Sequence, residues 1–222
     1  RDSFGVMKAK SELEAIKAFG ADRTTIVRPT YMVGPADRTD RFMHWPLRLA
    51  KGGDVLVPGM ADDPVQYIDI RDSAEWMIRL AEEKQAGTFN AVGPKAIQGV
   101  LEFANLAKEA FPVDTNLILI DDREFLHENR VSFIIPWISP DDDYYASARV
   151  NNTKAAQAGL TFRDLKDTIK DTHDWWFSSV TASENHQSWV SLKIPSRIPM
   201  TGGFLRQLLK KEGPSIMRAP DP

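Results

Sequence analysis

The sequence contains no cysteine. This absence excludes disulfide bonds, thiolate catalysis and cysteine-ligated zinc within the chain. It is compatible with a reducing compartment, and we expect a cytoplasmic location. No apolar run is long enough to span a bilayer, so no membrane segment is expected. A secretory signal peptide is not recognisable either, although the chain begins with Arg1 rather than methionine and we expect sequence upstream of it.

An excess of charge is also missing. The 222 residues carry a formal net charge of -3, whereas nucleic-acid binding requires a basic face, so nucleic acid is not an expected partner. The four histidines are far apart and have no metal-ligand spacing, and Asp141-Asp142-Asp143 lacks the spacing of a calcium loop. We therefore expect no metal site. Hydrophobic residues make up 42% of the chain, which is enough to bury a core.

Helical patterns alternate with short β-rich segments along the first 177 residues. Helices are expected over residues 3–19, 42–50, 72–80, 99–111, 122–129, 152–158 and 165–177, and strands over residues 24–28, 54–59, 65–68, 87–92 and 116–120. This alternation predicts an α/β fold with largely parallel pairing and helices on both faces of the sheet. Residues 133–140 are apolar and rich in proline, and are expected to form a loop that folds back.

The expected domain organisation has three parts. Residues 1–94 are expected to form the C-terminal part of a Rossmann-like domain with insertions from a substrate lobe. Residues 95–177 would form a smaller substrate-binding lobe. Polar residues and proline dominate residues 178–222, which we interpret as an extension or linker with one helical stretch at residues 204–211.

One helix carries a motif that is followed by a characteristic strand. Phe4-Gly5-Val6-Met7-Lys8 precedes a strand that ends at Arg28-Pro29 and continues to the turn Val33-Gly34-Pro35. This order resembles the extended short-chain dehydrogenase/reductase family, the NAD-dependent epimerases, dehydratases and related reductases, whose helix motif is Tyr-Gly-x-x-Lys with a glutamate one turn on. Three later segments also resemble the family, so the resemblance spans about Ser3 to Trp176: Gln66–Asp72, Phe89–Pro94 and Asn152–Leu160. It implies a partial Rossmann-like parallel sheet with a smaller C-terminal substrate-binding α/β lobe.

The resemblance implies a catalytic position at Phe4 and Lys8. In the family, a tyrosine hydroxyl moves a proton while the nicotinamide moves a hydride, and a lysine one turn away favours the phenolate and holds the cofactor ribose. Lys8 matches that lysine. Phe4 occupies the tyrosine position but has no hydroxyl, so the active site is degenerate. The alternative for Lys8 is a solvated helix lysine, and the alternatives for Phe4 are a core aromatic ring and an engineered replacement of a natural tyrosine.

Cofactor and substrate positions follow from the same resemblance. The family's segment along the nicotinamide matches Pro29, Thr30, Tyr31 and Met32. The alternative is a simple turn in which the proline ends strand pairing. The candidate substrate residues are Arg41, His44, Trp45 and Gln66. Such a mixture suits a polar or phosphorylated substrate such as a sugar nucleotide. The alternatives are a surface helix with one buried tryptophan and a solvent-facing strand glutamine.

A dinucleotide-binding fold needs a glycine-rich turn after its first strand, and this chain has none. Gly52-Gly53 and Gly202-Gly203 stand in the wrong context. We therefore expect the family's N-terminal half to lie outside this chain, and NAD or NADP to bind weakly or not at all to the chain alone. The missing strands would leave a sheet edge open, so we expect a homo-oligomer or association with the missing N-terminal half.

The sequence thus predicts an NAD(P)-dependent epimerase-like, dehydratase-like or reductase-like oxidoreductase, incomplete or inactive as this chain. One alternative is a non-catalytic protein on the same fold that binds a small molecule or RNA. Phe4 favours this alternative, and the acidic net charge disfavours its RNA version. A truncated product without an independent function is the other alternative.

Overall fold

The computed structural model describes residues 3–37, 41–129, 131 and 133–178. The extension predicted after Ser178, with its expected helical stretch, lies outside the described residues apart from Ser178 itself. The helices are α1 (Ser3–Phe19), α2 (His44–Lys51), α3 (Ile70–Glu82), α4 (Val100–Lys108), α5 (Arg123–Glu128), α6 (Thr153–Gln157) and α7 (Leu165–Trp176), with 3-10 turns η1 (Ala21–Arg23) and η2 (Tyr145–Arg149).

The strands are β1 (Thr25–Pro29), β2 (Met32–Val33), β3 (Gly53–Pro58), β4 (Pro64–Asp69), β5 (Gly87–Ala91), β6 (Gly93–Gly99), β7 (Thr115–Ile120), β8 (Phe133–Ile134) and β9 (Trp137–Ile138). Three pairs are parallel: β1 with β5, β2 with β4, and β3 with β7. The predicted α/β class with parallel pairing is therefore confirmed.

Three sheet features differ from the prediction. β2 is a two-residue strand in the segment that was expected to run directly from Pro29 to the turn at Gly34-Pro35. β6 pairs antiparallel with β4, although the glycine and proline at Gly93-Pro94 were expected to end the preceding strand. Among the described strands β6 contacts only β4, and an edge strand tolerates a proline that cannot donate a backbone hydrogen bond. The loop expected over residues 133–140 contains a short antiparallel hairpin, β8 with β9, which local composition did not indicate.

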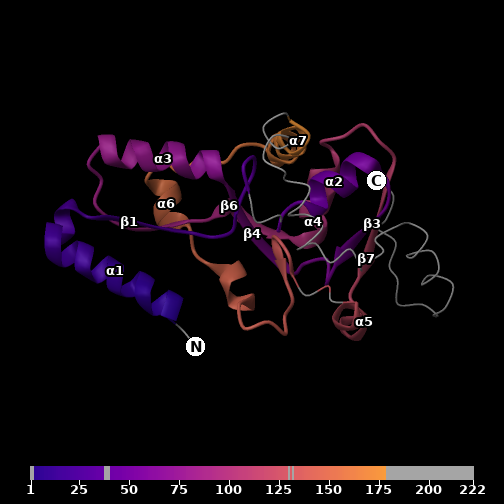
Figure 1. Ribbon diagram of the computed structural model, residues 1–222, viewed down its shortest axis with the longest axis horizontal. Coiled ribbons are helices and arrows are strands. Elements are labelled where there is room, and N and C mark those ends of the chain that lie inside the picture. Colours follow the sequence, from indigo (N-terminus) through magenta and orange to yellow (C-terminus); the bar gives the residue numbers. More distant parts are fainter. Residues whose placement is uncertain (1–2, 38–40, 130, 132, 179–222) are drawn as a thin grey trace.

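The described residues build two hydrophobic cores. In Figure 1, α1 and α3 lie on opposite sides of β1, whereas α2, α4 and α7 gather near β3 and β7. The smaller core lies between α3, β4, β5 and α6 and contains Ile68, Trp76, Leu80, Phe89, Ala91, Ala155 and Leu160. The larger core includes Trp45, Leu49, Val55, Phe103, Leu117 and Ile169. Both cores draw on residues from either side of residue 94, and the predicted division of the chain there stays a prediction.

A network of charged groups ties α3 to α7. Asp69 caps the start of α3 by accepting the backbone N–H of Arg71 at 2.9 Å, and it accepts the Nε and Nη2 groups of the same arginine at 2.9 and 2.7 Å. The hydroxyl of Thr168 on α7 donates to Asp69 at 2.8 Å. Burial raises the pKa of Asp69, but the hydrogen bonds from Arg71 and Thr168 outweigh burial and leave the pKa below its usual value.

Candidate functional site

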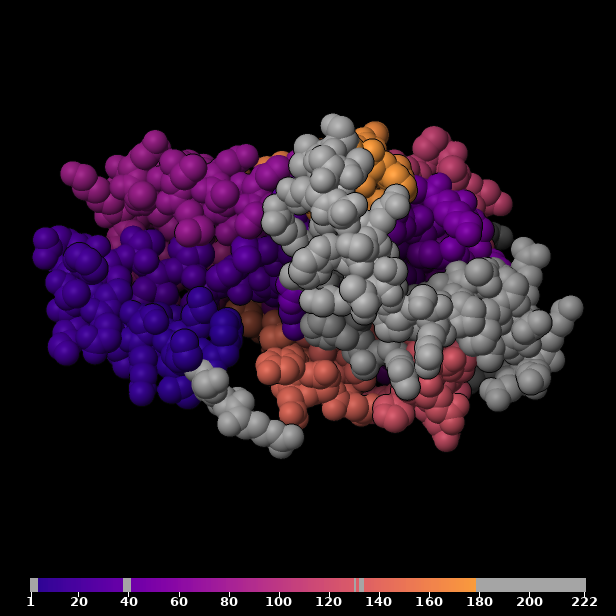
Figure 2. Space-filling model, viewed as in Figure 1, coloured from indigo at the N-terminus to yellow at the C-terminus, as the bar shows by residue number. Residues whose placement is uncertain are grey.

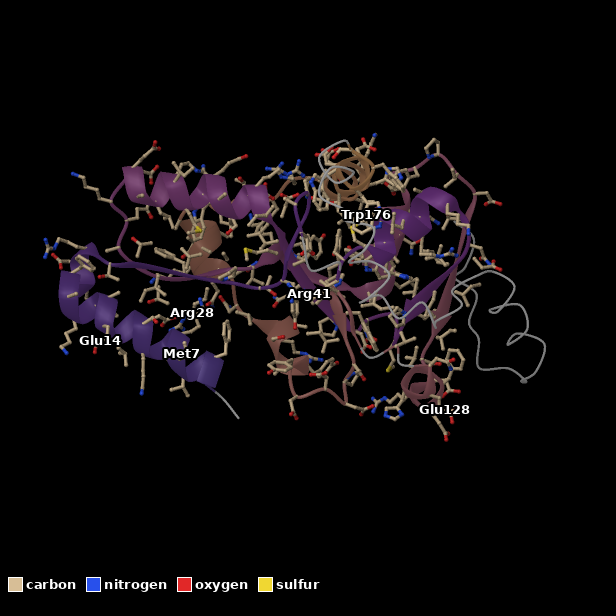
Figure 3. All side chains as sticks on the ribbon, viewed as in Figure 1. Met7, Glu14, Arg28, Arg41, Glu128 and Trp176 are labelled. Atoms are coloured by element: carbon tan, nitrogen blue, oxygen red, sulfur yellow. The ribbon has the colours of Figure 1, made fainter. Side chains whose placement is uncertain are left out.

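The predicted catalytic motif lies on an exposed face of α1. The Lys8 ammonium is 5.5 Å from the centre of the Phe4 ring, as expected for residues four apart on a helix. Phe4 is 73% exposed, so its ring does not fill a core in the described structure. One turn further on, Glu12 accepts the Nε group of Arg28 at 2.9 Å, which attaches α1 to β1. Figure 3 shows Arg28 between these two elements.

The carboxyl end of β1 carries the residues predicted to lie along a nicotinamide. Pro29 pairs with Ala91 at the end of β5, so two parallel strands end together, which is where α/β folds usually bind ligands. Thr30 donates its N–H to the carbonyl of Ala91 at 3.3 Å, and the carbonyl of Tyr31 accepts from Ile68 at 3.0 Å. These bonds fix the backbone of the segment, while Met32 remains exposed.

Tyr31 and Arg41 are the two predicted site residues that the structure brings together from different segments. The Arg41 guanidinium lies 5.6 Å from the centre of the Tyr31 ring. The ring of Tyr31 is half-buried, and burial raises the pKa of its hydroxyl, against the effect of a hydrogen bond with Ser147. Figure 3 shows Arg41 near the middle of the molecule. A cation and an aromatic face therefore meet close to the end of β1.

His44 and Trp45 lie elsewhere. Trp45 is fully buried, and its indole N–H donates to the carbonyl of Ile135 at 2.8 Å. The His44 ring packs against Trp45 with ring centres 4.9 Å apart, and its Nε2 lies 3.2 Å from the carbonyl of Leu56. Burial lowers the pKa of His44 to about 4, so the ring is neutral at neutral pH. Both side chains contact the core, and their substrate roles stay predictions.

Gln66 lines an open groove between β4, β6 and the segment 148–153. Its side-chain amide donates to the carbonyl of Val150 and accepts the N–H of Val150, both at 2.9 Å. The groove has a volume of about 370 Å³ and exposes the cations of Lys95 and Arg149. Two cations beside a groove suit an anionic group such as a phosphate. Gln66 attaches β4 to the backbone of Val150 on the other side of the groove. A substrate contact by Gln66 stays a prediction.

A separate cavity of about 150 Å³ lies at the carboxyl ends of β3 and β7, beside α5 and β9. Its polar lining includes Asp63, Asp121, Arg123 and His127. No site residue predicted from the sequence lines this cavity. The lining joins residues 59–63 to residues 121–142, more than 50 residues later in the chain, and only the parallel pairing of β3 with β7 could have indicated that they meet.

Two further classes of site are not found in the described part of the chain. The described residues contain no group of three or more histidine, aspartate or glutamate side chains that could hold a metal ion. Among the same residues, no helix is both long enough and apolar enough to cross a bilayer.

No protein-family model and no curated protein matches the chain significantly. Among solved structures, the chain is similar to RMD from Pseudomonas aeruginosa complexed with NADPH, with a TM-score of 0.52 and 15% sequence identity over 80% of this chain and 57% of that one. It is also similar to WbmF from Bordetella bronchiseptica in complex with NAD⁺, with a TM-score of 0.53 and 15% identity over 87% of this chain and 58% of that one.

Both of these structures contain a nicotinamide cofactor, NADPH in RMD and NAD⁺ in WbmF. At these sequence identities the similarity concerns the fold, and the predicted Rossmann-like architecture is confirmed at that level. The chain spans a little over half of the length of RMD and WbmF.

Proposed function

We propose that this chain is the substrate-side part of an NAD(P)-dependent oxidoreductase of the epimerase, dehydratase or reductase type, acting in the cytoplasm on a polar substrate such as a sugar nucleotide. The observation that carries the proposal is the fold shared over at least 80% of the chain with two proteins whose structures contain NADPH or NAD⁺. The exposed pair of Phe4 and Lys8 on α1 supports it, because both side chains are accessible to a ligand.

The proposed roles divide between the cofactor and the substrate. Lys8 would hold the ribose next to the nicotinamide, and the segment from Pro29 to Met32 would lie along the carboxamide. Arg41 and the groove beside Gln66 would face the substrate, whose anionic groups would meet Lys95 and Arg149. Phe4 has no hydroxyl, so this chain would position a nicotinamide without supplying the phenol that moves the proton.

The cofactor would be held through only one of its halves. The sequence has no glycine-rich turn that could hold the pyrophosphate. We therefore expect the isolated chain to bind whole NADH or NADPH only in the millimolar range, with every measurable contact made to the nicotinamide nucleotide.

A titration with the two halves of the cofactor tests the proposal. Nicotinamide mononucleotide and adenosine monophosphate would be added separately to the ¹⁵N-labelled chain, and NMR shifts of Lys8 and of Thr30 to Met32 would be followed. We expect shifts with the nicotinamide half only, because the adenylate half has no cradle in this chain. Lys8→Ala should weaken this response at least about fivefold, whereas Lys10→Ala, an exposed lysine on the same helix, should not.

Two results would contradict the proposed division of the cofactor. Adenosine monophosphate would shift the resonances of the same residues as strongly as nicotinamide mononucleotide does, or NADPH would bind the isolated chain in the micromolar range. No response to either half would favour the second candidate, a non-catalytic binding protein on this fold. The observation behind that candidate is Phe4, because the position where the resembled family has tyrosine carries no group that could transfer a proton.

The proposed partner is a second polypeptide at α1 and the outer edge of β1. Within the described residues, β1 pairs with β5 alone, so its other edge is open. α1 exposes several large apolar side chains, among them Val6, Leu13 and Ile16. A second copy of the chain or the N-terminal half of a longer protein would cover this surface.

A further inference from the structure

The cavity at the carboxyl ends of β3 and β7 is a second candidate site, independent of the proposed oxidoreductase function. Parallel strands leave their carboxyl ends together at one edge, where the loops that follow them can enclose a ligand. Here the loops begin at Gly59 and Asp121, and the backbone N–H of Gly59 donates to the carbonyl of Ile120 at 2.8 Å. Leu126, Val131 and Trp137 form the apolar part of the wall.

A buried carboxylate belongs to the lining of this cavity. Asp63 is 6% exposed, and its Oδ2 accepts the indole N–H of Trp137 at 2.9 Å and the backbone N–H of Met60 at 3.1 Å. Its other oxygen has no hydrogen bond, and no lysine or arginine pairs with it, within the described part of the chain. That oxygen is not a fully buried atom, so a ligand in the cavity can reach it, and a cationic ligand would form a charge-assisted hydrogen bond with Asp63.

Gly59 allows the side chains of Asp63 and Trp137 to pack against the backbone and against each other. Its φ is +84°, and a Cβ at this position would lie 2.3 Å from Oδ2 of Asp63 and 2.3 Å from the indole nitrogen of Trp137. Only glycine leaves room for the contact between these two side chains. The end of β3, the turn before β4 and the hairpin strand β9 therefore fix the position of the Asp63 carboxylate together.

The charges of the cavity wall determine the class of ligand. Among the described residues that line it, four are carboxylates, Asp63, Asp121, Asp141 and Asp142, and the basic side chains are one arginine, Arg123, and one histidine, His127. Arg123 already pairs with Asp141 at 3.2 Å. The remaining negative charge favours a cation. The described residues contain no group of side chains arranged to hold a metal ion, at this cavity or elsewhere, so an organic cation is the better candidate.

We propose that this cavity binds a small organic ammonium ion, with its N–H groups donating to Asp63 and Asp121 and its methylene groups against Leu126, Val131 and Trp137. Charge-assisted hydrogen bonds between ammonium and carboxylate are short and strong, and an adjacent aromatic ring adds attraction for a cation. A volume of about 150 Å³ holds about five groups of the size of a water molecule, which matches a primary amine with three or four carbons.

Three probes of equal size and different charge test this inference on the whole chain. n-Propylammonium, n-propanol and propionate would each be titrated while the indole N–H resonance of Trp137, identified by its loss in Trp137→Phe, is followed by NMR. We expect propylammonium to shift this resonance saturably and at least about tenfold more tightly than propanol, and propionate to have no effect. The affinity should fall as salt is added, because the attraction is electrostatic.

Matched variants separate the cavity from general surface charge. Asp63→Asn keeps the size and an acceptor for Trp137 and should weaken propylammonium binding at least about tenfold. Asp121→Asn should weaken it as well, which keeps the test valid if Asp63→Asn does not fold. Asp143→Asn, in the same acidic turn but outside the cavity lining, should leave binding unchanged.

Equal binding of propanol, tighter binding of propionate, or no saturable shift with propylammonium up to about 100 mM would each overturn the proposal. Binding that Asp143→Asn weakens as much as Asp63→Asn would also overturn it, because the response would then report surface charge. None of these outcomes bears on the nicotinamide proposal, which concerns α1 and the end of β1.

Discussion

Two glycines with positive φ differ in what surrounds them. Gly59 has a φ of +84° with Asp63 and Trp137 packed against it, whereas Gly53 has a φ of +74° with no atom within 4 Å of an added Cβ. We expect Gly53→Ala to lower the free energy of unfolding by about 1 kcal/mol, the cost of the left-handed backbone alone. Gly59→Ala should lower it by about 3 kcal/mol or more, because the methyl group must also displace two buried side chains.

Urea unfolding followed by circular dichroism would measure both variants. Equal losses would show that the Asp63 and Trp137 side chains move aside without cost, and that Gly59 does not enforce their contact. In that case the carboxylate in the cavity would be less firmly held than the structure shows.

Single residues also show why the site was only partly predictable. The contact between Phe4 and Lys8 follows from a spacing of four on one helix, so the sequence contained it. The sequence left Trp45 open between a substrate role and burial, because the carbonyl that accepts its indole N–H belongs to Ile135, 90 residues away. The Asp63 and Trp137 pair was missed for the same reason, since 74 residues separate the two partners.

At the scale of elements, the join between α3 and α7 depends on Asp69. This carboxylate is 3% exposed and receives hydrogen bonds from Arg71 and from Thr168. We expect Asp69→Asn to lower the free energy of unfolding by about 2 to 3 kcal/mol at pH 7. This loss is smaller than that expected for a fully buried ion pair, because Arg71 is partly exposed and also pairs with Asp171. Asp167→Asn, an exposed carboxylate on α7, should change it by about 0.5 kcal/mol or less.

The contribution of Asp69 should depend on pH with a definite sign. Its pKa is lowered in the folded chain, so the folded state binds its proton less readily than the unfolded state does. The stabilisation is therefore complete above the pKa of an unfolded aspartate, about 4, and is lost as the pH falls through the lower folded value. Denaturation at pH 7 and at pH 3 should show the gap between the wild type and Asp69→Asn narrowing at the lower pH. A gap that widens would contradict this account.

Elements with strong local signals were predicted, and elements that depend on pairing were not. The helix expected over residues 165–177 corresponds to α7, because its apolar periodicity and its capping aspartate are local. β6 contains Pro94, and Pro136 lies between β8 and β9, so the local signals of these segments indicate turns. β6 becomes a strand because it pairs with β4, and β8 and β9 because they pair with each other. Composition alone does not specify such pairing.

At the scale of the whole molecule, α1 is the feature that the described chain leaves uncovered. Figure 2 shows α1, in indigo, at one end of the molecule. Val6, Leu13 and Ile16 lie seven and three residues apart, so they share one face of the helix, and all three are exposed. Ala9 falls on the same face and leaves room for a close approach. A face of this kind, beside the open edge of β1, is suited to a helix of a second copy.

We therefore expect the chain to self-associate through α1, with the proportion of dimer rising over a concentration range of about 1 to 100 μM. Leu13→Glu should shift this equilibrium toward monomer at least about tenfold, because it places a charge in the centre of the apolar face. Ile78→Glu is the matched control, since Ile78 is 60% exposed but lies on α3. Sedimentation velocity of the three proteins measures the effect. Two results would show that α1 does not form the contact between copies: a wild-type chain that stays monomeric over this range, or dissociation by Ile78→Glu as effective as by Leu13→Glu. The partner of the exposed face would then be the N-terminal half of a longer protein.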